Sequence, residues 1–294
     1  MTRRPQFGVV FPQNEIDPAG VHTLAFGRGV EELGFRHVAA FDHVVGADTA
    51  TRPDWNGHYD VDDEFHEPLV LFAYLAAATE LEFTSAVIIL PQRQTVLVAK
   101  QAATLDQLSG GRLRLGVGIG WNEVEYEALG VPYAGRAERL EDQIALLRRL
   151  WTTRTVTWNS AYNSIDRAGI APLPAQRPIP IWFGTWARAA APLRRIGELA
   201  DGWMPTSIDP GPELKAAKQV VDRAAEAAGR DPATIGFEGR ITVGRGLDPY
   251  GVPAVVDEWI SLGATHITID TRRSRRRNAE HLDLLAQVAI ALEL

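Results

Sequence analysis

Short apolar runs alternate along the chain with longer segments in which apolar residues recur at helical spacing. The helical pattern is clearest in 136–151, where one face carries Leu140, Ile144, Leu147 and Trp151. The short runs are rich in β-branched and aromatic residues, and turn residues end them. They predict eight strands, at 7–11, 37–41, 83–90, 112–119, 180–183, 202–205, 235–243 and 265–270.

A helix is predicted after each strand. The expected helices cover 19–33, 68–79, 95–108, 136–151, a segment ending at 199, 213–228, 253–262 and the stretch carrying Leu282, Leu285, Ala289 and Leu292. Such alternation implies parallel pairing through right-handed crossovers. Eight units of this kind fit an α/β fold of the (β/α)8 TIM-barrel type, and we expect residues 1–294 to form a single domain.

Two connections are longer than simple loops. Residues 45–66 follow the second predicted strand, and 152–178 follow the helix at 136–151 and contain turns, prolines and a possible hairpin pattern. Loops of this length are often lids or binding loops. We expect insertions at the carboxyl-terminal face of the barrel, where either segment would serve as a lid or as a dimer contact.

Composition excludes several classes of protein. The formal net charge is −7, which argues against a general nucleic-acid partner. The chain has no cysteine, so it has no disulfides or thiolate metal ligands, and its histidines lack metal-binding spacing, so we expect no metal. No apolar run reaches about 18 residues and no signal-peptide core is recognisable, so we expect a cytoplasmic protein without a membrane span.

Asp42-His43, at the end of the second predicted strand, is the best candidate for acid–base chemistry. In a barrel, functional residues lie in the loops that follow the strands. Histidine titrates near neutral pH and can therefore donate or accept a proton, while the adjacent carboxylate would hold it or accept a hydrogen bond from a bound ring. The alternative is a polar pair that satisfies the backbone of the loop.

Two glycine-containing segments also follow strands. Gly116-Val-Gly-Ile-Gly-Trp121 permits close approach of a ligand, but it is not a dinucleotide fingerprint because Trp121 stands where the third glycine belongs. Small residues that accommodate inward packing are the alternative. Gly184-Thr185-Trp186 precedes a helix whose free N–H groups would bind phosphate, although most βα loops have similar sequences.

Arginines cluster after the last two predicted strands. Arg245 follows the seventh strand, and Arg272, Arg273, Arg275, Arg276 and Arg277 follow the eighth. Barrels often bind phosphate in these two loops. The cluster is therefore either a binding site for the anionic tail of a ligand or a solvated charged surface.

Together these segments resemble the luciferase-like monooxygenase superfamily and, within it, the F420-dependent oxidoreductases. The resemblance covers nearly the whole chain. It depends on Gly34-Phe35, Phe41-Asp42-His43, Glu67-Pro68-Leu69, 75–79, 89–112, 115–122, Arg136, 147–151, 178–184 and 200–203.

The resemblance implies a deazaflavin or flavin across the mouth of the barrel and, commonly, a homodimer. Asp42 and His43 would touch the ring and supply the acid–base group. A non-prolyl cis peptide is expected behind the ring, at Ala86–Val87 or Val87–Ile88. The implied cofactor-binding residues are Asp42, Ala86, Val87, Ile88, Gly118, Ile119, Gly120, Gly184, Thr185, Arg245 and Arg272, the two arginines facing the phosphate and oligoglutamate tail of F420.

We therefore predict hydride transfer between F420 and a small organic substrate, with His43 as the acid–base group. Trp121, Trp186 and the 45–66 loop with Trp55 would shape the substrate pocket. One alternative is a reduced-FMN monooxygenase, although flavin members often place an arginine in the fourth-strand loop and 116–120 has none. Another is a catalytically inactive cofactor-binding protein.

Two departures from the relatives affect the prediction. F420-dependent sugar-phosphate dehydrogenases carry a catalytic glutamate where this chain has Trp121, which argues against that activity. Many relatives have two glycines where this chain has Gly184-Thr185, so contacts to phosphate would differ.

Overall fold

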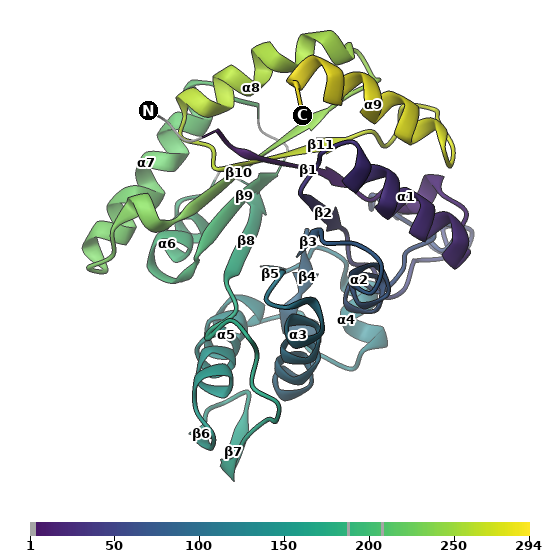
Figure 1. Cartoon of the computed structure of the whole chain (residues 1–294). Coiled ribbons are helices and arrows are strands. Elements are labelled where there is room, and N and C mark those ends of the chain that lie inside the picture. Colours follow the sequence, from purple (N-terminus) through teal and green to yellow (C-terminus); the bar gives the residue numbers. More distant parts are fainter. Residues whose placement is uncertain (1–3, 187–188, 207–208) are drawn as a thin grey trace.

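Parallel strands close into a barrel at the centre of the molecule (Figure 1). The computed structural model describes residues 4–186, 189–206 and 209–294. The β3–β5 pairing closes the ring and so confirms the predicted (β/α)8 fold. In order around the barrel, the strands are β1 (Gln6–Val10), β2 (His37–Ala40), β3 (Glu82–Ser85) with β4 (Ile88–Ile89), β5 (Leu113–Gly118), β8 (Ile181–Trp186), β9 (Gly202–Thr206), β10 (Gly236–Thr242) and β11 (His266–Asp270).

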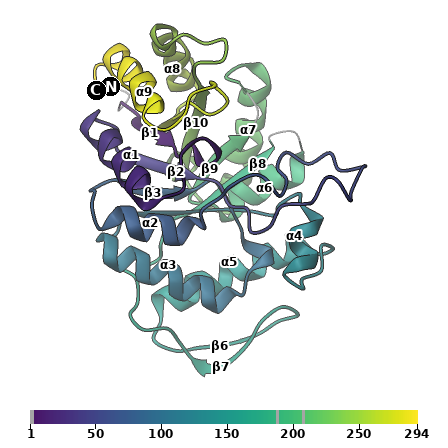
Figure 2. The same ribbon diagram turned by 90° about the vertical axis from the view of Figure 1, so that its right-hand side faces the viewer.

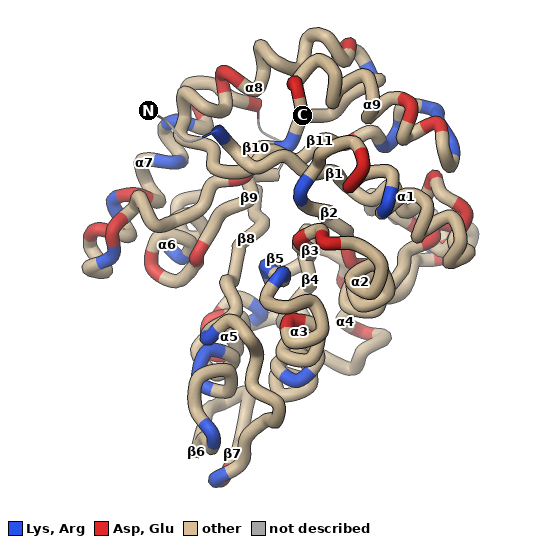
Figure 3. The backbone as a smooth tube through the Cα atoms, viewed as in Figure 1, with Lys and Arg blue, Asp and Glu red and all other residues tan. Residues whose placement is uncertain are grey.

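Helices surround the strands in both views (Figures 1 and 2). The predicted helix at 136–151 is α5, and its residues Leu140, Ile144, Leu147 and Trp151 are all buried, as their spacing predicted. The helices are α1 (Gly20–Glu32), α2 (Pro68–Ala76), α3 (Thr95–Ser109), α4 (Glu123–Ala128), α5 (Arg136–Thr152), α6 (Ala190–Leu199), α7 (Pro212–Ala227), α8 (Val252–Ser261) and α9 (Glu280–Leu292). The short helix α4 was not predicted. Charged residues lie largely on these outer elements (Figure 3).

The third barrel strand is interrupted between β3 and β4. The Ala86–Val87 peptide bond is cis, at one of the two positions that the family resemblance indicated. β3 pairs with β2 and with the start of β5, whereas β4 pairs with Val117 and Gly118 at the end of β5. Residues 86 and 87 therefore stand at the carboxyl-terminal end of the barrel, beside the segment 116–120.

A buried polar network fills the amino-terminal part of the barrel interior. Arg114 Nη1 donates to Glu238 Oε2 at 2.7 Å, and Thr268 Oγ1 donates to Glu238 Oε1 at 2.6 Å. The Nε2 atom of His37 lies 2.8 Å from Thr268 Oγ1. Burial, with Arg114 acting in the same direction, lowers the pKa of His37 well below its ordinary value and that of His266 to about 2. Both imidazoles are therefore neutral in this network.

The second long insertion forms an antiparallel hairpin of β6 (Val156–Asn159) and β7 (Ser164–Ala168), next to α3 and α5 (Figure 2). Residues 171–176 bind α3 and the start of β5: Gln107 Nε2 donates to Leu173 O, and Gln176 Nε2 to Leu113 O. In a (β/α)8 barrel, a segment that leads from the end of a helix to the start of a strand lies at the amino-terminal face, and residues 152–178 are such a segment. They contribute no residue to the cavity described below, so the prediction that they form a lid is wrong. The dimer contact stays a prediction.

Within the three described ranges, no helix is long and apolar enough to cross a membrane. The same ranges hold no cluster of three or more His, Asp or Glu side chains that could bind a metal ion.

Candidate active site at the carboxyl-terminal mouth of the barrel

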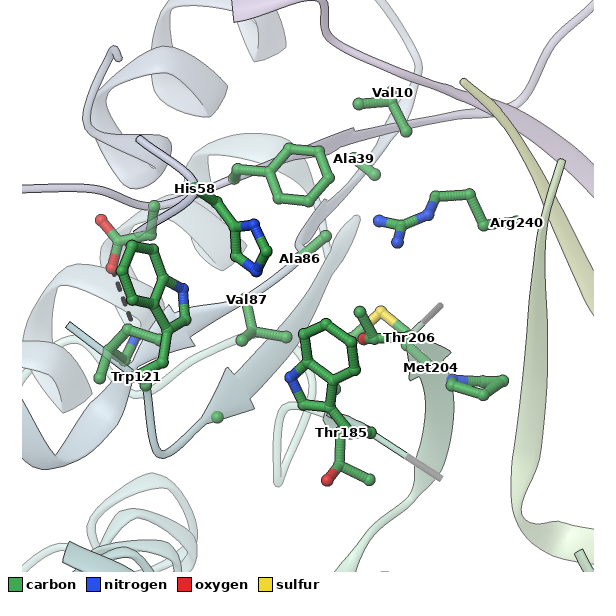
Figure 4. Close-up of a pocket in the computed structure, with 18 of the residues that line it drawn as sticks. Val10, Ala39, His58, Ala86, Val87, Trp121, Thr185, Met204, Thr206 and Arg240 are labelled. Atoms are coloured by element: carbon green, nitrogen blue, oxygen red, sulfur yellow. Dashed lines mark hydrogen bonds between the residues drawn. The ribbon is translucent and has the colours of Figure 1, made fainter. Parts of the chain in front are cut away.

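One cavity of about 660 Å³ opens at the carboxyl-terminal ends of the strands (Figure 4). Cavities of this size hold small molecules and cofactors. It brings together the strand ends that sequence analysis singled out. The predicted site residues that line it are Asp42, His43, Ala86, Val87, Gly118, Ile119, Gly120, Trp121, Gly184, Thr185, Trp186, Arg245 and Arg272. Ile88 and Trp55 do not line it, because Ile88 is fully buried in the core and Trp55 packs behind Trp121.

His43 is held by a carboxylate that sequence analysis missed. Its Nδ1 atom lies 2.9 Å from Oε1 of Glu125, which also accepts from the backbone N–H of Val44 at 3.2 Å. Gln92 Nε2 donates to the second oxygen at 3.1 Å. Because a carboxylate only accepts hydrogen bonds, Nδ1 is the donor in this contact and Nε2 is the ring nitrogen left free of Glu125. Among the described residues, Nε2 has no hydrogen-bond partner.

Glu125 reaches His43 from the helix that follows the glycine segment. Asn122 caps α4 by accepting a hydrogen bond from the N–H of Val124 at 3.0 Å, which fixes the start of the helix. Glu125, one turn further on, is buried, with a side-chain exposure of 1%. The signal in the sequence was this cap and its acidic first turn, but nothing in it indicated which distant residue the carboxylate would meet.

Asp42 points away from His43 and binds Arg93. The Arg93 Nη2 atom lies 2.8 and 3.0 Å from the two oxygens of Asp42, and the N–H of Ile89 donates to one of them. Burial raises the pKa of Asp42, and Arg93 acts against that effect. For Arg93, burial acts to lower the pKa, but Asp42 and Glu67 outweigh it. The ion-paired geometry supports a charged pair. Asp42 therefore anchors the loop to β4 and the start of α3, and it does not orient His43.

Val87 projects between two of the predicted cofactor-binding glycines. A methyl group at Gly118 would lie 2.6 Å from Val87 Cγ2, and one at Gly184 would lie 2.6 Å from Val87 Cγ1. At Gly116 it would meet the backbone oxygen of Ser85 at 1.7 Å. These glycines are thus required for inward packing around the interrupted strand, and Gly118 and Gly184 line the cavity as well.

Aromatic residues of the 45–66 loop form one wall of the cavity. His58 stacks on Trp186 with 6.2 Å between ring centroids and meets Trp121 edge-on at 5.4 Å. Tyr59 packs on His43 at 4.6 Å. This loop therefore covers part of the cavity, as expected of a lid, and Figure 4 shows His58 and Trp121 on the same side of it.

The predicted anion site is only partly free to bind an anion. Arg272 is committed to Asp270, whose oxygens accept from its Nε and Nη2 at 3.0 and 2.8 Å, and it donates to Tyr59. Burial acts to raise the pKa of Asp270, but Arg272 lowers it below its ordinary value. Arg245 and Arg273 are exposed and line the cavity, whereas Arg275, Arg276 and Arg277 do not.

Two further cavity residues were not among the predicted binding residues. Arg136, at the start of α5, stacks on the ring of Tyr133 at 3.7 Å. Arg240 lies inside the barrel on β10. The alternation of side chains along a strand places Arg240 on the same face as Glu238 and Thr242. The sequence does not show whether this face points into the barrel.

Fold and site together define a (β/α)8 barrel with a cavity at the carboxyl-terminal mouth, where His43 and Glu125 are in contact. The family model for luciferase-like monooxygenases matches residues 7–246, and the chain belongs to this family. An uncharacterized protein of Mycobacterium tuberculosis is 38% identical over 211 residues, which cover 71% of this chain and 70% of that protein. The FMNH(2)-dependent dimethylsulfone monooxygenase of Pseudomonas putida is 32% identical over 174 residues, 58% of this chain and 46% of that enzyme.

Solved structures of an F420-dependent dehydrogenase and of a monooxygenase share the fold. An F420-dependent secondary alcohol dehydrogenase, solved with an F420–acetone adduct, has a TM-score of 0.79 at 16% identity, with 99% of each chain covered. The long-chain alkane monooxygenase LadA has a TM-score of 0.79 at 13% identity and covers 100% of this chain and 93% of its own. These identities establish the barrel and leave the cofactor undecided.

Proposed function

We propose that this protein is an F420-dependent oxidoreductase that transfers hydride between coenzyme F420 and a small organic substrate, with His43 as the acid–base residue. The observation that carries the proposal is the His43–Glu125 contact of 2.9 Å at the wall of the cavity. It presents a single imidazole nitrogen for proton transfer beside a space that fits a planar cofactor. An F420-dependent secondary alcohol dehydrogenase has the same fold, so the barrel is compatible with this chemistry.

The charges of the cavity fit an anionic cofactor. Its acidic residues are each paired: Asp42 with Arg93, Glu238 with Arg114 and Asp270 with Arg272. Among the described residues, the guanidinium groups of the lining arginines Arg136, Arg245 and Arg273 have no carboxylate partner; Arg273 binds Glu15 only through its backbone N–H. Separate cations around one mouth suit a ligand that carries several negative charges, such as F420 with its phosphate and glutamates.

Bound F420 would supply a hydride acceptor or donor, and the protein would supply orientation and a proton. Gly118, Ile119 and Gly120 with Val87 would hold the ring, and Gly184, Thr185 and the mouth arginines would hold the phosphate and tail. His43 Nε2 would give a proton to a substrate oxygen in reduction, or take one from a hydroxyl in oxidation. Glu125 would keep Nδ1 protonated and the imidazole in place. The 45–66 loop would limit the access of water.

A reduced-FMN monooxygenase is the second candidate, and the sequence similarity to the dimethylsulfone monooxygenase favours it. A catalytically inactive cofactor-binding protein is the third. The absence of arginine from 116–120 argues for F420 over FMN, and the intact contact between His43 and Glu125 argues against loss of activity.

Titration with F420 and with FMN distinguishes the candidates. Trp121 and Trp186 line the cavity, so ligand binding will quench tryptophan fluorescence. We expect saturable F420 binding that weakens with salt, and FMN binding at least about tenfold weaker, a difference of about 1.4 kcal/mol. Tighter binding of FMN than of F420 would instead indicate the monooxygenase. F420 binding without F420-dependent turnover of any alcohol or carbonyl compound, unchanged in His43→Ala, would indicate the inactive protein.

A further inference from the structure

A further arginine, Arg240, lies deeper in the cavity than the arginines of the mouth. Arg240 stands on β10, in register with Thr268 of β11, whereas Asp270 is level with the last residue of β10. Arg245 and Arg273 lie beyond the ends of their strands. The side chain of Arg240 points into the cavity, across from His58 and Trp121 (Figure 4). It is partly buried, and its guanidinium lies 5.5 Å from the ring centre of Phe41.

Arg240 has no acceptor among the described residues. Asp270 uses both oxygens on Arg272, at 3.0 and 2.8 Å, and Glu238 uses both on Arg114 and Thr268, at 2.7 and 2.6 Å. Burial lowers the pKa of Arg240, and Asp270 acts against that effect. The guanidinium stays protonated at neutral pH, since arginine does not deprotonate in proteins. One positive charge therefore faces the inner wall of the cavity without a hydrogen-bond acceptor among the described residues, and a partly desolvated charge gains from an anionic partner.

We infer that Arg240 binds a carboxylate group of the substrate, so that the substrate is a small organic acid. This rests on the proposed function, and it assigns the substrate class. A guanidinium binds a carboxylate through two parallel N–H···O bonds. The hydroxyl of Thr206 lies on the same wall, and Val10, Ala39 and Met204 provide apolar surface for the remainder of the molecule. The phosphate and tail of F420 lead to solvent and match the mouth, whereas Arg240 lies below it.

Matched acids and amides test this assignment by calorimetry, without turnover. The probes are acetate and acetamide, butyrate and butyramide, and 3-phenylpropionate and 3-phenylpropanamide, each with the full-length protein in the absence and presence of F420. A hydrogen bond to a charged group contributes about 1.5–3 kcal/mol, so we expect at least one acid to bind about tenfold to a hundredfold more tightly than its amide. Arg240→Gln should abolish the preference, and Arg240→Lys should retain part of it.

Arg149→Gln is the matched control, since it removes the same charge from an exposed position on α5 and should leave the preference unchanged. Circular dichroism and thermal unfolding establish whether each variant is folded. If Arg240→Gln does not fold, Arg240→Lys replaces it in the comparison of acids with amides. The inference is overturned if no acid is preferred over its amide, or if the preference persists in Arg240→Gln. It is also overturned if Arg240→Gln weakens the binding of F420 about tenfold to a hundredfold, because Arg240 would then bind the cofactor.

The F420 titration separates this inference from the proposed function. A wild-type protein that binds no F420 but prefers acids through Arg240 would reject the proposed cofactor and still support the anion site. A protein that binds F420 and shows no such preference would reject the anion site alone.

Discussion

His43 and Glu125 lie 82 residues apart in the sequence, and their side chains meet at 2.9 Å at the wall of the cavity. The contact joins the end of the second barrel strand to a helix that follows the fourth strand position. It fixes the tautomer of the imidazole, because the carboxylate accepts the Nδ1 proton. Glu125, and not the neighbouring Asp42, is therefore the residue that holds His43, the acid–base group of the proposed function.

Glu125→Gln should lower kcat by about 10- to 100-fold, less than the about 10²- to 10⁴-fold that general acid–base catalysis contributes as a whole. The amide group of glutamine cannot accept from all three donors that converge on this carboxylate, so His43 loses its fixed orientation. The dissociation constant for F420 should stay unchanged, which a merely structural defect would not allow. Glu123→Gln, at an exposed position on the same helix, is the control. Equal kcat in the two variants would contradict the positioning role.

The sequence predicted the barrel because each strand and helix has its own local pattern of apolar residues. It also predicted which strand ends line the cavity, since parallel strands place all their carboxyl ends at one mouth. Asp42, His43, Gly118–Gly120 and Gly184–Thr185 could be found in this way. The cis bond at Ala86–Val87 came from family resemblance, because no local pattern of residues indicates it.

Contacts between distant segments could not be predicted. Asp42 was expected either to hold His43 or to accept a hydrogen bond from a bound ring; its carboxylate binds Arg93, a residue 51 positions away, and does not hold His43. Arg272 was expected to face an anionic tail, yet Asp270, two residues before it, accepts its hydrogen bonds. The 152–178 insertion was assigned to the wrong face, because its length was considered without its position after a helix. Pairing of charges depends on side-chain directions that only the assembled barrel determines.

Gly118→Ala should destabilise the protein by about 1–3 kcal/mol, the usual cost of overpacking. The new methyl group would lie 2.6 Å from Val87 Cγ2. Val87→Ala removes that carbon, so the double variant should recover most of the loss. Gly211→Ala, where nothing lies within 4 Å of the added methyl group, tests the loss of glycine without overpacking and should cost less than about 1 kcal/mol, as expected at the N-cap of α7. Urea unfolding of wild type, the two single variants and the double variant measures the coupling between the two sites. Additive losses of stability would show that Val87 does not fill this space.

Stability should fall as the pH is lowered below about 6.5, the pKa of histidine in an unfolded chain. His266 is held neutral down to a pKa of about 2, so the unfolded state binds a proton that the folded state does not between these values. Stability is therefore present above 6.5 and is lost as pH falls through this window, at about 1.4 kcal/mol per pH unit for each such group. In His266→Gln, the free energy of unfolding should therefore depend less steeply on pH, by the contribution of one histidine. Urea unfolding at pH 7, 6 and 5 measures this dependence. An equal dependence in wild type and variant would contradict the neutral state of His266 in the folded protein.

His58→Ala should raise KM by about three- to tenfold with little change in kcat. It removes the ring that links the 45–66 loop to Trp121 and Trp186, and an aromatic contact contributes about 0.5–1.5 kcal/mol beyond its buried area. Steady-state kinetics measure both constants. His22→Ala, on α1 and exposed, is the control. A loss confined to kcat would mean that His58 takes part in the chemistry and does not serve as a contact of the lid.

The most direct test is the rate of F420-dependent turnover in wild type and in His43→Gln, measured by F420 absorbance with saturating F420 and with the alcohol or carbonyl compound that wild type converts fastest. The account predicts a fall of about 10²- to 10⁴-fold in His43→Gln with unchanged F420 binding. Turnover by His43→Gln at the wild-type rate would contradict the assignment of the proton to this imidazole.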